Sequence, residues 1–219
     1  MLNLDAQGMV VHARVIARRY SQIERQPFTE IEGIIVHQTG AATSASAFNS
    51  YGNANANGAH FLIDKDGAIY QTASVKKRTN HVGPLLARCL VEFKCQPAEF
   101  KQSKQFPQSS VPDRMHKIEM QKSVPVRYPS NVDSLGIEIV GRPSLPPGKN
   151  PPGNATPKQR EIFFNQNAVY EPVNNAQNAS LQWLLDELAM SLSIPKTEVF
   201  RHPTVSRKNP TEASTAAWQ

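Results

Sequence analysis

The segment between residues 60 and 71 constrains the fold most strongly, because it predicts a β-hairpin. Residues 60–63 read HFLI and residues 68–71 read AIYQ, and both runs are strand-like. The four residues between them, Asp64-Lys65-Asp66-Gly67, contain the Asp-Gly pair that is typical of tight hairpin turns. The chain is therefore expected to contain a pair of adjacent antiparallel strands.

The hairpin lies within an alternation of strand-like and helix-like segments. Ile34-Ile35-Val36 is a short apolar run that ends at His37, and residues 176–192 have the strongest amphipathic pattern of the chain. Further strands are expected at residues 135–141 and 198–201, and further helices at residues 9–25, from Thr43 or Ser44, and from Thr156-Pro157. This order predicts an α/β fold with a single mixed central β-sheet flanked by helices.

The length of 219 residues suits one α/β domain with a substantial core. We interpret residues 1–219 as a single domain, in which residues 1–30 form an N-terminal extension. Residues 84–132 contain many polar residues and prolines with little periodicity, so they are interpreted as an insertion or excursion within the domain, helical near residues 85–95.

The two cysteines, Cys89 and Cys95, do not form a CxxC motif, and no histidine follows them at the spacing of a zinc finger. A structural zinc site at these residues is therefore not expected. The sequence favours two small buried hydrophobic residues, and the alternative is a local disulfide in an oxidising compartment.

The formal net charge of +6 suits an anionic partner such as nucleic acid, a membrane surface or a bacterial envelope polymer, and it equally suits solubility. The basic residues are scattered in pairs and carry no nucleic-acid fold signature, so no nucleic-acid partner is expected. No segment approaches the roughly 18–20 apolar residues of a membrane span. The first twenty residues lack the regions of a secretory signal, so synthesis in the cytoplasm without a signal peptide is expected.

Two histidines each follow a predicted strand. His37 follows residues 34–36 and His202 follows residues 198–201, so both are expected at the carboxyl ends of strands, where ligands collect in such folds. Glu212 lies ten residues beyond His202, and a loop can bring it back beside the histidines. Two imidazoles, a carboxylate and an open position for water form a typical catalytic zinc site. The alternative for each histidine is a hydrogen-bonded structural role.

Glu138 lies between the apolar residues Ile137 and Ile139 in a predicted strand, and it faces away from both because side chains alternate along a strand. One interpretation is a carboxylate on a solvated face. The other is a general base aimed at a water that zinc activates. In the loop after His202, Lys208 or Arg207 is a candidate to stabilise an oxyanion, with surface charge as the alternative.

Five segments occur in an order that resembles the type 2 N-acetylmuramoyl-L-alanine amidases and the peptidoglycan recognition proteins of the same superfamily: IIVHQTG, GAHFLIDKDGAIYQ, NHVG, SLGIEIVG and RHPTVSRKNPTEAS. The resemblance covers roughly residues 30–83 and 131–215. It implies the amidase-like fold, zinc (Zn2+) as cofactor, and peptidoglycan or muropeptides as substrate. The bond cut would be the amide between N-acetylmuramic acid and L-alanine.

The resemblance also implies roles for individual residues. It places the zinc ligands at His37, His202 and Glu212, and the catalytic base at Glu138. Asn209 is the competing alignment for the third ligand, but its side-chain amide is a poor ligand for zinc.

The chain departs from the family pattern at two positions. The phage enzymes carry a tyrosine where this chain has Ala59, and the usual catalytic lysine, two residues before the last ligand, is replaced by Pro210. Lys208 stands four residues before that ligand, a different spacing from that of the family's lysine, and is the candidate for its role. His81, in the NHVG segment, occupies a position that lines the substrate groove in the family, which implies substrate binding. His60 is expected to be structural, and His12 and His116 are given no role.

An enzyme is expected, and the alternative is a non-catalytic peptidoglycan-binding module of the same fold, which would typically lack the third ligand. The sequence also resembles antibacterial amidase effectors that secretion systems such as type VI deliver. That resemblance implies cell wall degradation in the periplasm of a target cell and an immunity protein as partner. A cytoplasmic recycling enzyme or a phage endolysin is the alternative.

Overall fold

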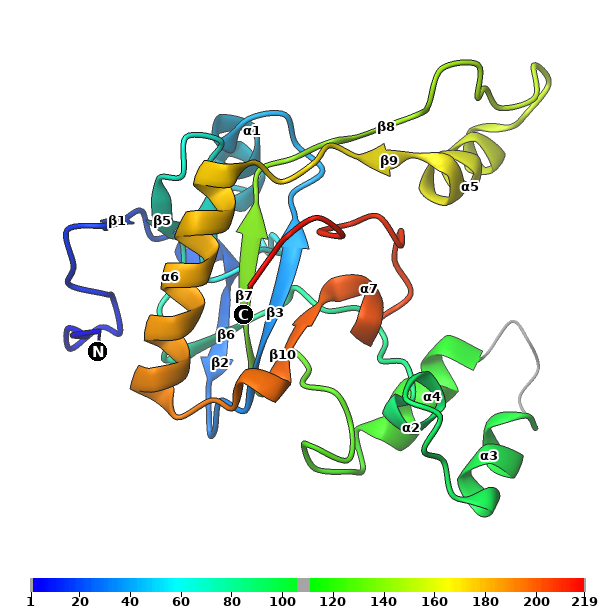
Figure 1. Ribbon diagram of the computed structural model, residues 1–219, viewed down its shortest axis with the longest axis horizontal. Coiled ribbons are helices and arrows are strands. Elements are labelled where there is room, and N and C mark those ends of the chain that lie inside the picture. The colour runs from blue at the N-terminus through cyan, green and yellow to red at the C-terminus, as the bar shows by residue number, and fades with distance from the viewer. Residues whose placement is uncertain (1, 106–110, 219) are drawn as a thin grey trace.

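A six-stranded mixed sheet forms the centre of the protein in a computed structural model, which describes residues 2–105 and 111–218 (Figure 1). Its strand order is β1 (Val15–Ala17), β5 (Ile69–Gln71), β4 (Phe61–Ile63), β7 (Ser134–Ile139), β3 (Gly33–Gln38) and β10 (Val199–Arg201). Strands β4 and β5 pair antiparallel, as the Asp-Gly hairpin predicts, and the other neighbouring pairs are parallel. The mixed α/β sheet predicted from the sequence is therefore confirmed.

The helices begin where the sequence places polar caps. Thr43 accepts a hydrogen bond from the backbone of Ser46 at the start of α1 (Ser44–Tyr51), and Thr156 caps α5 (Pro157–Asn167) in the same way. Asn174 and Gln177 cap α6 (Asn175–Leu192) reciprocally.

The remaining elements are η1 (Ser21–Ile23), β2 (Glu24–Pro27), β6 (Lys77–Thr79), α2 (Arg88–Val91), α3 (Pro97–Ser103), α4 (Val111–Glu119), β8 (Pro143–Ser144), β9 (Val169–Tyr170), η3 (Lys196–Glu198) and α7 (His202–Val205).

The two faces of the sheet have different roles. Helix α6 covers one face, where Leu181, Leu184 and Leu188 pack in one core cluster with apolar residues of β3, β4 and β7 (Figure 1). Because side chains alternate along a strand, His37 of β3 and Glu138 of β7 point to the opposite face. The polar residues of interest therefore lie on the face that α6 leaves uncovered.

The prediction of a helix over residues 9–25 is wrong. This segment forms β1, η1 and β2, with Val15 and Ile16 paired to Ile69 and Tyr70 of β5. The apolar spacing is compatible with a helix, but β-branched side chains favour strands, and the free edge of β5 offers a pairing partner.

Residues 84–132 contain α2, α3 and α4, which lie to one side of the sheet (Figure 1). Cys89 and Cys95 form a disulfide here, so the preference for two buried hydrophobic residues is wrong. The reason is local: α2 ends after four residues and Phe93 adopts a positive φ of 56°, which reverses the chain and brings the two half-buried cysteines together. Arg88 ties this segment to the sheet through a 2.8 Å ion pair with Glu198, directly before β10.

None of the helices in the described ranges combines the length and the apolar character that a membrane span requires.

Truncation of the core under α6 is expected to destabilise the protein strongly. Leu184 is fully buried, so Leu184→Ala should lower the free energy of unfolding by about 2–5 kcal/mol, whereas Met190→Ala, at a side chain on the same helix that is 56 % exposed, should change it by less than about 0.5 kcal/mol. Equilibrium urea unfolding measures both. Equal effects of the two variants would contradict the assignment of α6 to the core.

Candidate active site

The register of three parallel strands brings the predicted site residues together. Strand β7 pairs with β3 so that Glu138 lies opposite His37. Strand β10 pairs with β3 so that Arg201 lies opposite Val36, and the next residue, His202, therefore comes beside His37. The rings of His37 and His202 lie 4.2 Å apart, centroid to centroid. His37 is still within β3, one residue before the end of the strand, and His202 opens α7.

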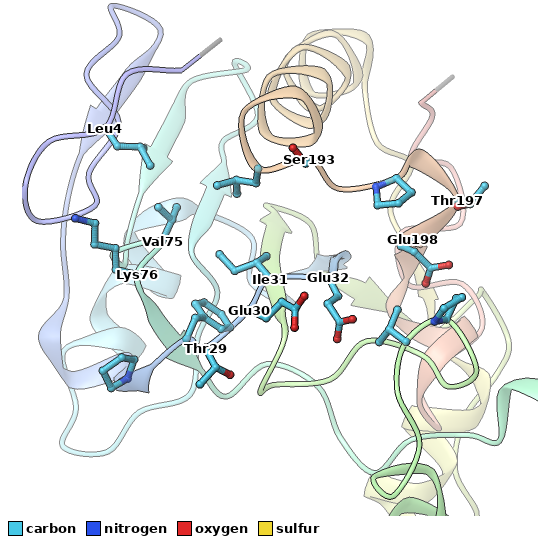
Figure 2. Close-up of a pocket in the computed structure, with 16 residues that line it drawn as sticks. Leu4, Thr29, Glu30, Ile31, Glu32, Val75, Lys76, Ser193, Thr197 and Glu198 are labelled. Carbon is cyan, nitrogen blue, oxygen red and sulfur yellow. The ribbon is translucent and has the colours of Figure 1, made fainter.

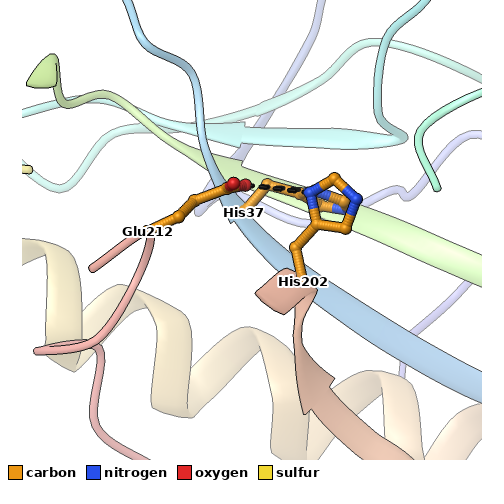
Figure 3. A group of neighbouring side chains, drawn as sticks. All are labelled: His37, His202 and Glu212. Atoms are coloured by element: carbon orange, nitrogen blue, oxygen red, sulfur yellow. Dashed lines mark hydrogen bonds and ion pairs between the residues drawn. The ribbon is translucent and has the colours of Figure 1, made fainter. Parts of the chain in front are cut away.

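The loop after α7 returns Glu212 to the two histidines, and the Asn209 side chain holds that loop in place. The Asn209 amide donates to the Ala168 carbonyl at 2.7 Å, and its oxygen accepts from the backbone and hydroxyl of Thr211. Asn209 is therefore occupied within the loop. Glu212, and not Asn209, is the residue that lies beside His37 and His202 (Figure 3).

The three side chains fit a tetrahedral zinc ion. Glu212 Oε1 lies 3.0 Å from His202 Nδ1 and 3.6 Å from His37 Nδ1. One atom from each residue lies within 4.8 Å of the other two. Donor atoms about 2.1 Å from a tetrahedral centre lie about 3.4 Å apart, close to these separations. The donor set of two imidazoles and one carboxylate is also the one that zinc accepts.

The charges at this cluster suit a cation. Burial would raise the pKa of Glu212, but the close contacts of its carboxylate with His202 and His37 outweigh burial and lower the pKa to about 2. Burial, together with the proximity of His202, lowers the pKa of His37 to about 4, so this imidazole is neutral at neutral pH. A buried carboxylate beside a neutral imidazole offers a negative charge and a free lone pair to a metal ion.

His81 contacts His37 and determines which of its nitrogen atoms is free. His81 Nε2 lies 3.2 Å from the Ser134 carbonyl, which only accepts, so Nε2 carries the proton. His81 Nδ1, 3.0 Å from His37 Nε2, then accepts a hydrogen bond from it. His37 Nδ1 is left unprotonated, and this is the atom that faces Glu212. The sequence did not indicate this positioning contact.

Space for the His81 ring depends on Gly136 of β7. A Cβ atom at Gly136 would lie 2.8 Å from the ring, closer than carbon atoms normally approach. The Asn131 side chain accepts from the backbone N–H groups of His81 and Val82 and so holds this segment against the strand.

Glu138 is half-buried and accepts a short hydrogen bond from the Tyr51 hydroxyl. Burial raises the pKa of Glu138 to about 7, with the charge of Glu212 adding to the effect and the Tyr51 hydrogen bond opposing it. A carboxyl group with this pKa takes up and releases a proton near neutral pH. Tyr51 was not identified from the sequence.

A cavity of about 380 Å³ opens over these residues. It is lined by His37, Gln38, Thr39, Asn57, Gly58, Asn80, His81, Val82, Gly83, Glu138, Tyr170, His202, Lys208 and Glu212. Lys208 thus reaches the site, and Arg207 is not among the residues that line the cavity. Tyr170, which the sequence also did not indicate, is linked to the loop that carries Glu212, because its backbone N–H donates to the Thr211 hydroxyl.

The other three histidines lie away from this cavity. His60 accepts from the Gly136 backbone at 3.0 Å and lies 2.8 Å from the Lys77 carbonyl, so it links β7 to β6. The His12 ring lies against Trp183, tilted by 38° with the centroids 4.9 Å apart, and His116 accepts from the backbone of Leu85. None of the three lines the cavity.

A larger cavity, of about 840 Å³, lies beyond the other end of β3, between the segment before that strand and the end of α6 (Figure 2). Its walls are mostly apolar, and its lining includes Phe28, Ile31 and Leu192 together with the carboxylates of Glu30 and Glu32. Among the described residues, no histidine or cysteine lines it. The cluster of histidines and carboxylates therefore belongs to the smaller cavity.

The chain belongs to the N-acetylmuramoyl-L-alanine amidase family, whose model matches residues 27–213. A search of curated proteins finds no match.

Solved structures of similar fold include the catalytic domain of XlyA, with 20 % identity, a TM-score of 0.47, and coverage of 89 % of this chain and 87 % of that one. The N-acetylmuramoyl-L-alanine amidase LysC from Clostridium intestinale URNW has 16 % identity, a TM-score of 0.44, and coverage of 89 % and 85 %. The amidase AmiD from E. coli, solved with anhydro-N-acetylmuramic acid-L-Ala-D-gamma-Glu-L-Lys, has 14 % identity, a TM-score of 0.48, and coverage of 92 % and 57 %.

Loss of the His81 contact is expected to weaken zinc binding. The variant His81→Phe keeps a ring but removes both nitrogens, so zinc affinity should fall by about 10- to 100-fold. Competition with a chromogenic chelator measures the affinity, and His12→Phe, at the ring that lies against Trp183, is the matched control. An unchanged affinity in His81→Phe would contradict the positioning role.

The raised pKa of Glu138 predicts a pH-dependent stability in zinc-free protein. Between the ordinary pKa of 4.5 and about 7 the folded state binds more protons than the unfolded state, so this residue's contribution to stability falls as pH rises through that range. Glu138→Gln removes the effect. The free energy of unfolding of the variant minus that of wild type should therefore be roughly 2 kcal/mol larger at pH 7.5 than at pH 4.5. A constant difference in urea unfolding would show that the pKa is ordinary.

Proposed function

We propose that this protein is a zinc-dependent hydrolase that cleaves the amide between N-acetylmuramic acid and L-alanine in peptidoglycan. One observation carries the proposal: His37, His202 and Glu212 converge at a cavity that also contains Glu138. The family to which the chain belongs supports the choice of bond.

In this proposal His37, His202 and Glu212 hold the zinc ion. When bound there, zinc supplies a Lewis acid that polarises the scissile carbonyl and lowers the pKa of water. Glu138 takes the proton of the attacking water and later gives it to the amine of the leaving L-alanine, for which a pKa near 7 is well suited.

Two further residues face the substrate in this proposal. Lys208 lines the cavity and places a positive charge where the oxyanion develops. His81 forms part of the same wall, so its substrate contact is proposed in addition to its contact with His37.

The disulfide supports a site of action outside the reducing cytoplasm. Cys89–Cys95 is a bond that persists in oxidising compartments such as the periplasm. We therefore propose action in the periplasm of a target cell in preference to a cytoplasmic recycling role. The antibacterial role, delivery by a secretion system and an immunity protein as partner belong to the same proposal.

The proposal is tested by digesting purified peptidoglycan with the protein, with and without a chelator, and identifying the products by mass. Stem peptides that begin at L-alanine should appear, disappear with chelator and return with zinc. Glu138→Gln should retain zinc and lower kcat by about 100-fold or more, whereas Glu212→Ala should lose zinc. The exposed Glu161→Gln is the control.

Intact peptidoglycan after treatment with folded, zinc-loaded protein would overturn the proposal. Intact but bound peptidoglycan, with folded protein that takes up no zinc, would favour the non-catalytic binding module.

A further inference from the structure

Tyr51 is held rigidly at the end of α1. It is 3 % exposed and packs in a cluster with Ile23, Phe48 and Leu62. The ring of Tyr20 meets it edge-on at 5.8 Å. On another side the chain passes so closely that a Cβ atom at Gly58 would lie 2.8 Å from the Tyr51 ring. The ring therefore has little freedom to move.

The hydroxyl group of Tyr51 is directed at Glu138. The hydroxyl donates a hydrogen bond to Glu138 Oε2. An ionised carboxylate can only accept, so the hydroxyl proton lies on the side of the carboxylate. Burial, and then the charge of Glu138, raise the pKa of Tyr51 well above its ordinary value, so the hydroxyl remains a donor at neutral pH.

Glu138 needs such an anchor because the sheet fixes only its backbone. The ladder between β7 and β3 places its Cα opposite that of His37, but the side chain beyond it has three rotatable bonds. A hydrogen bond to one carboxylate oxygen restrains these bonds and leaves the other oxygen for the cavity that Glu138 lines.

We propose that Tyr51 is a positioning residue for the general base: its hydroxyl holds Glu138 Oε2 so that Oε1 meets the attacking water. The inference rests on the proposed amidase function and adds to it a residue from α1. Because a misplacement of about 1 Å can cost about 100-fold in rate, the contact is expected to affect kcat more than KM.

The test is a double-variant cycle of wild type, Tyr51→Phe, Glu138→Gln and the combination, assayed for kcat and KM on a soluble muropeptide. Tyr51→Phe removes one oxygen and should lower kcat by about 10- to 100-fold with KM within about twofold and zinc content unchanged. In the Glu138→Gln background the same change should alter kcat by less than about twofold, because the group that it positions is already gone. Tyr70→Phe, a phenol that packs against the same cluster, is the matched control and should behave as wild type.

A Tyr51→Phe enzyme with the kcat of Tyr70→Phe would overturn the inference. So would an equal loss in both backgrounds, which would indicate a structural role. If Tyr51→Phe does not fold, Gly58→Ala, which displaces the ring without removing the hydroxyl, takes its place in the cycle.

The failure of the proposed function is distinguishable, because it would appear as inactive wild-type protein. The contact is then tested without turnover by urea unfolding of the same four zinc-free proteins. A combined loss of stability different from the sum of the single losses supports the contact, and strict additivity overturns it.

Discussion

The parallel register of β3 with β7 and β10 is the constraint on which the site depends. It places His37 opposite Glu138 and delivers His202 beside His37, so three functional side chains take their positions from backbone hydrogen bonds. A shift of one residue in β3 would turn His37 toward α6 and an apolar neighbour toward the cavity. Loops then contribute Glu212, Lys208 and His81 to a frame that the sheet has already set.

Two carboxylates at this site differ because their surroundings differ. Glu212 is held by two imidazoles and keeps its charge, with a pKa of about 2. Burial, together with the charge of Glu212, raises the pKa of Glu138 to about 7, and the hydrogen bond from the Tyr51 phenol opposes the rise. One carboxylate is thus a permanent anion suited to a metal ion, and the other exchanges a proton near neutral pH. Behind the site, Tyr51 contacts Glu138 and His81 contacts His37, so that each orients one functional side chain.

Much of the fold and of the candidate site follows from local sequence signals. The Asp-Gly turn, the capping threonines and the leucines of α6 each depend on neighbours within a few residues, and alternation along β7 was enough to single out Glu138. Contacts between distant segments leave no such trace: Tyr51 meets Glu138 across 87 positions, and His81 meets His37 across 44. Residues 15–17 form a strand because they pair with β5. The two cysteines form a disulfide because the chain reverses at Phe93. Neither the strand pairing nor the chain reversal can be deduced from the spacing of apolar residues.

The outermost strands of the sheet, β1 and β10, contain three residues each. Beyond β10 the chain turns at once into α7, where Pro203 has no N–H to offer. Short edges of this kind present few free backbone groups to a neighbouring molecule, which disfavours the addition of foreign strands. The turn that delivers His202 to the site therefore also ends the edge strand early and limits the backbone groups to which a foreign strand could pair.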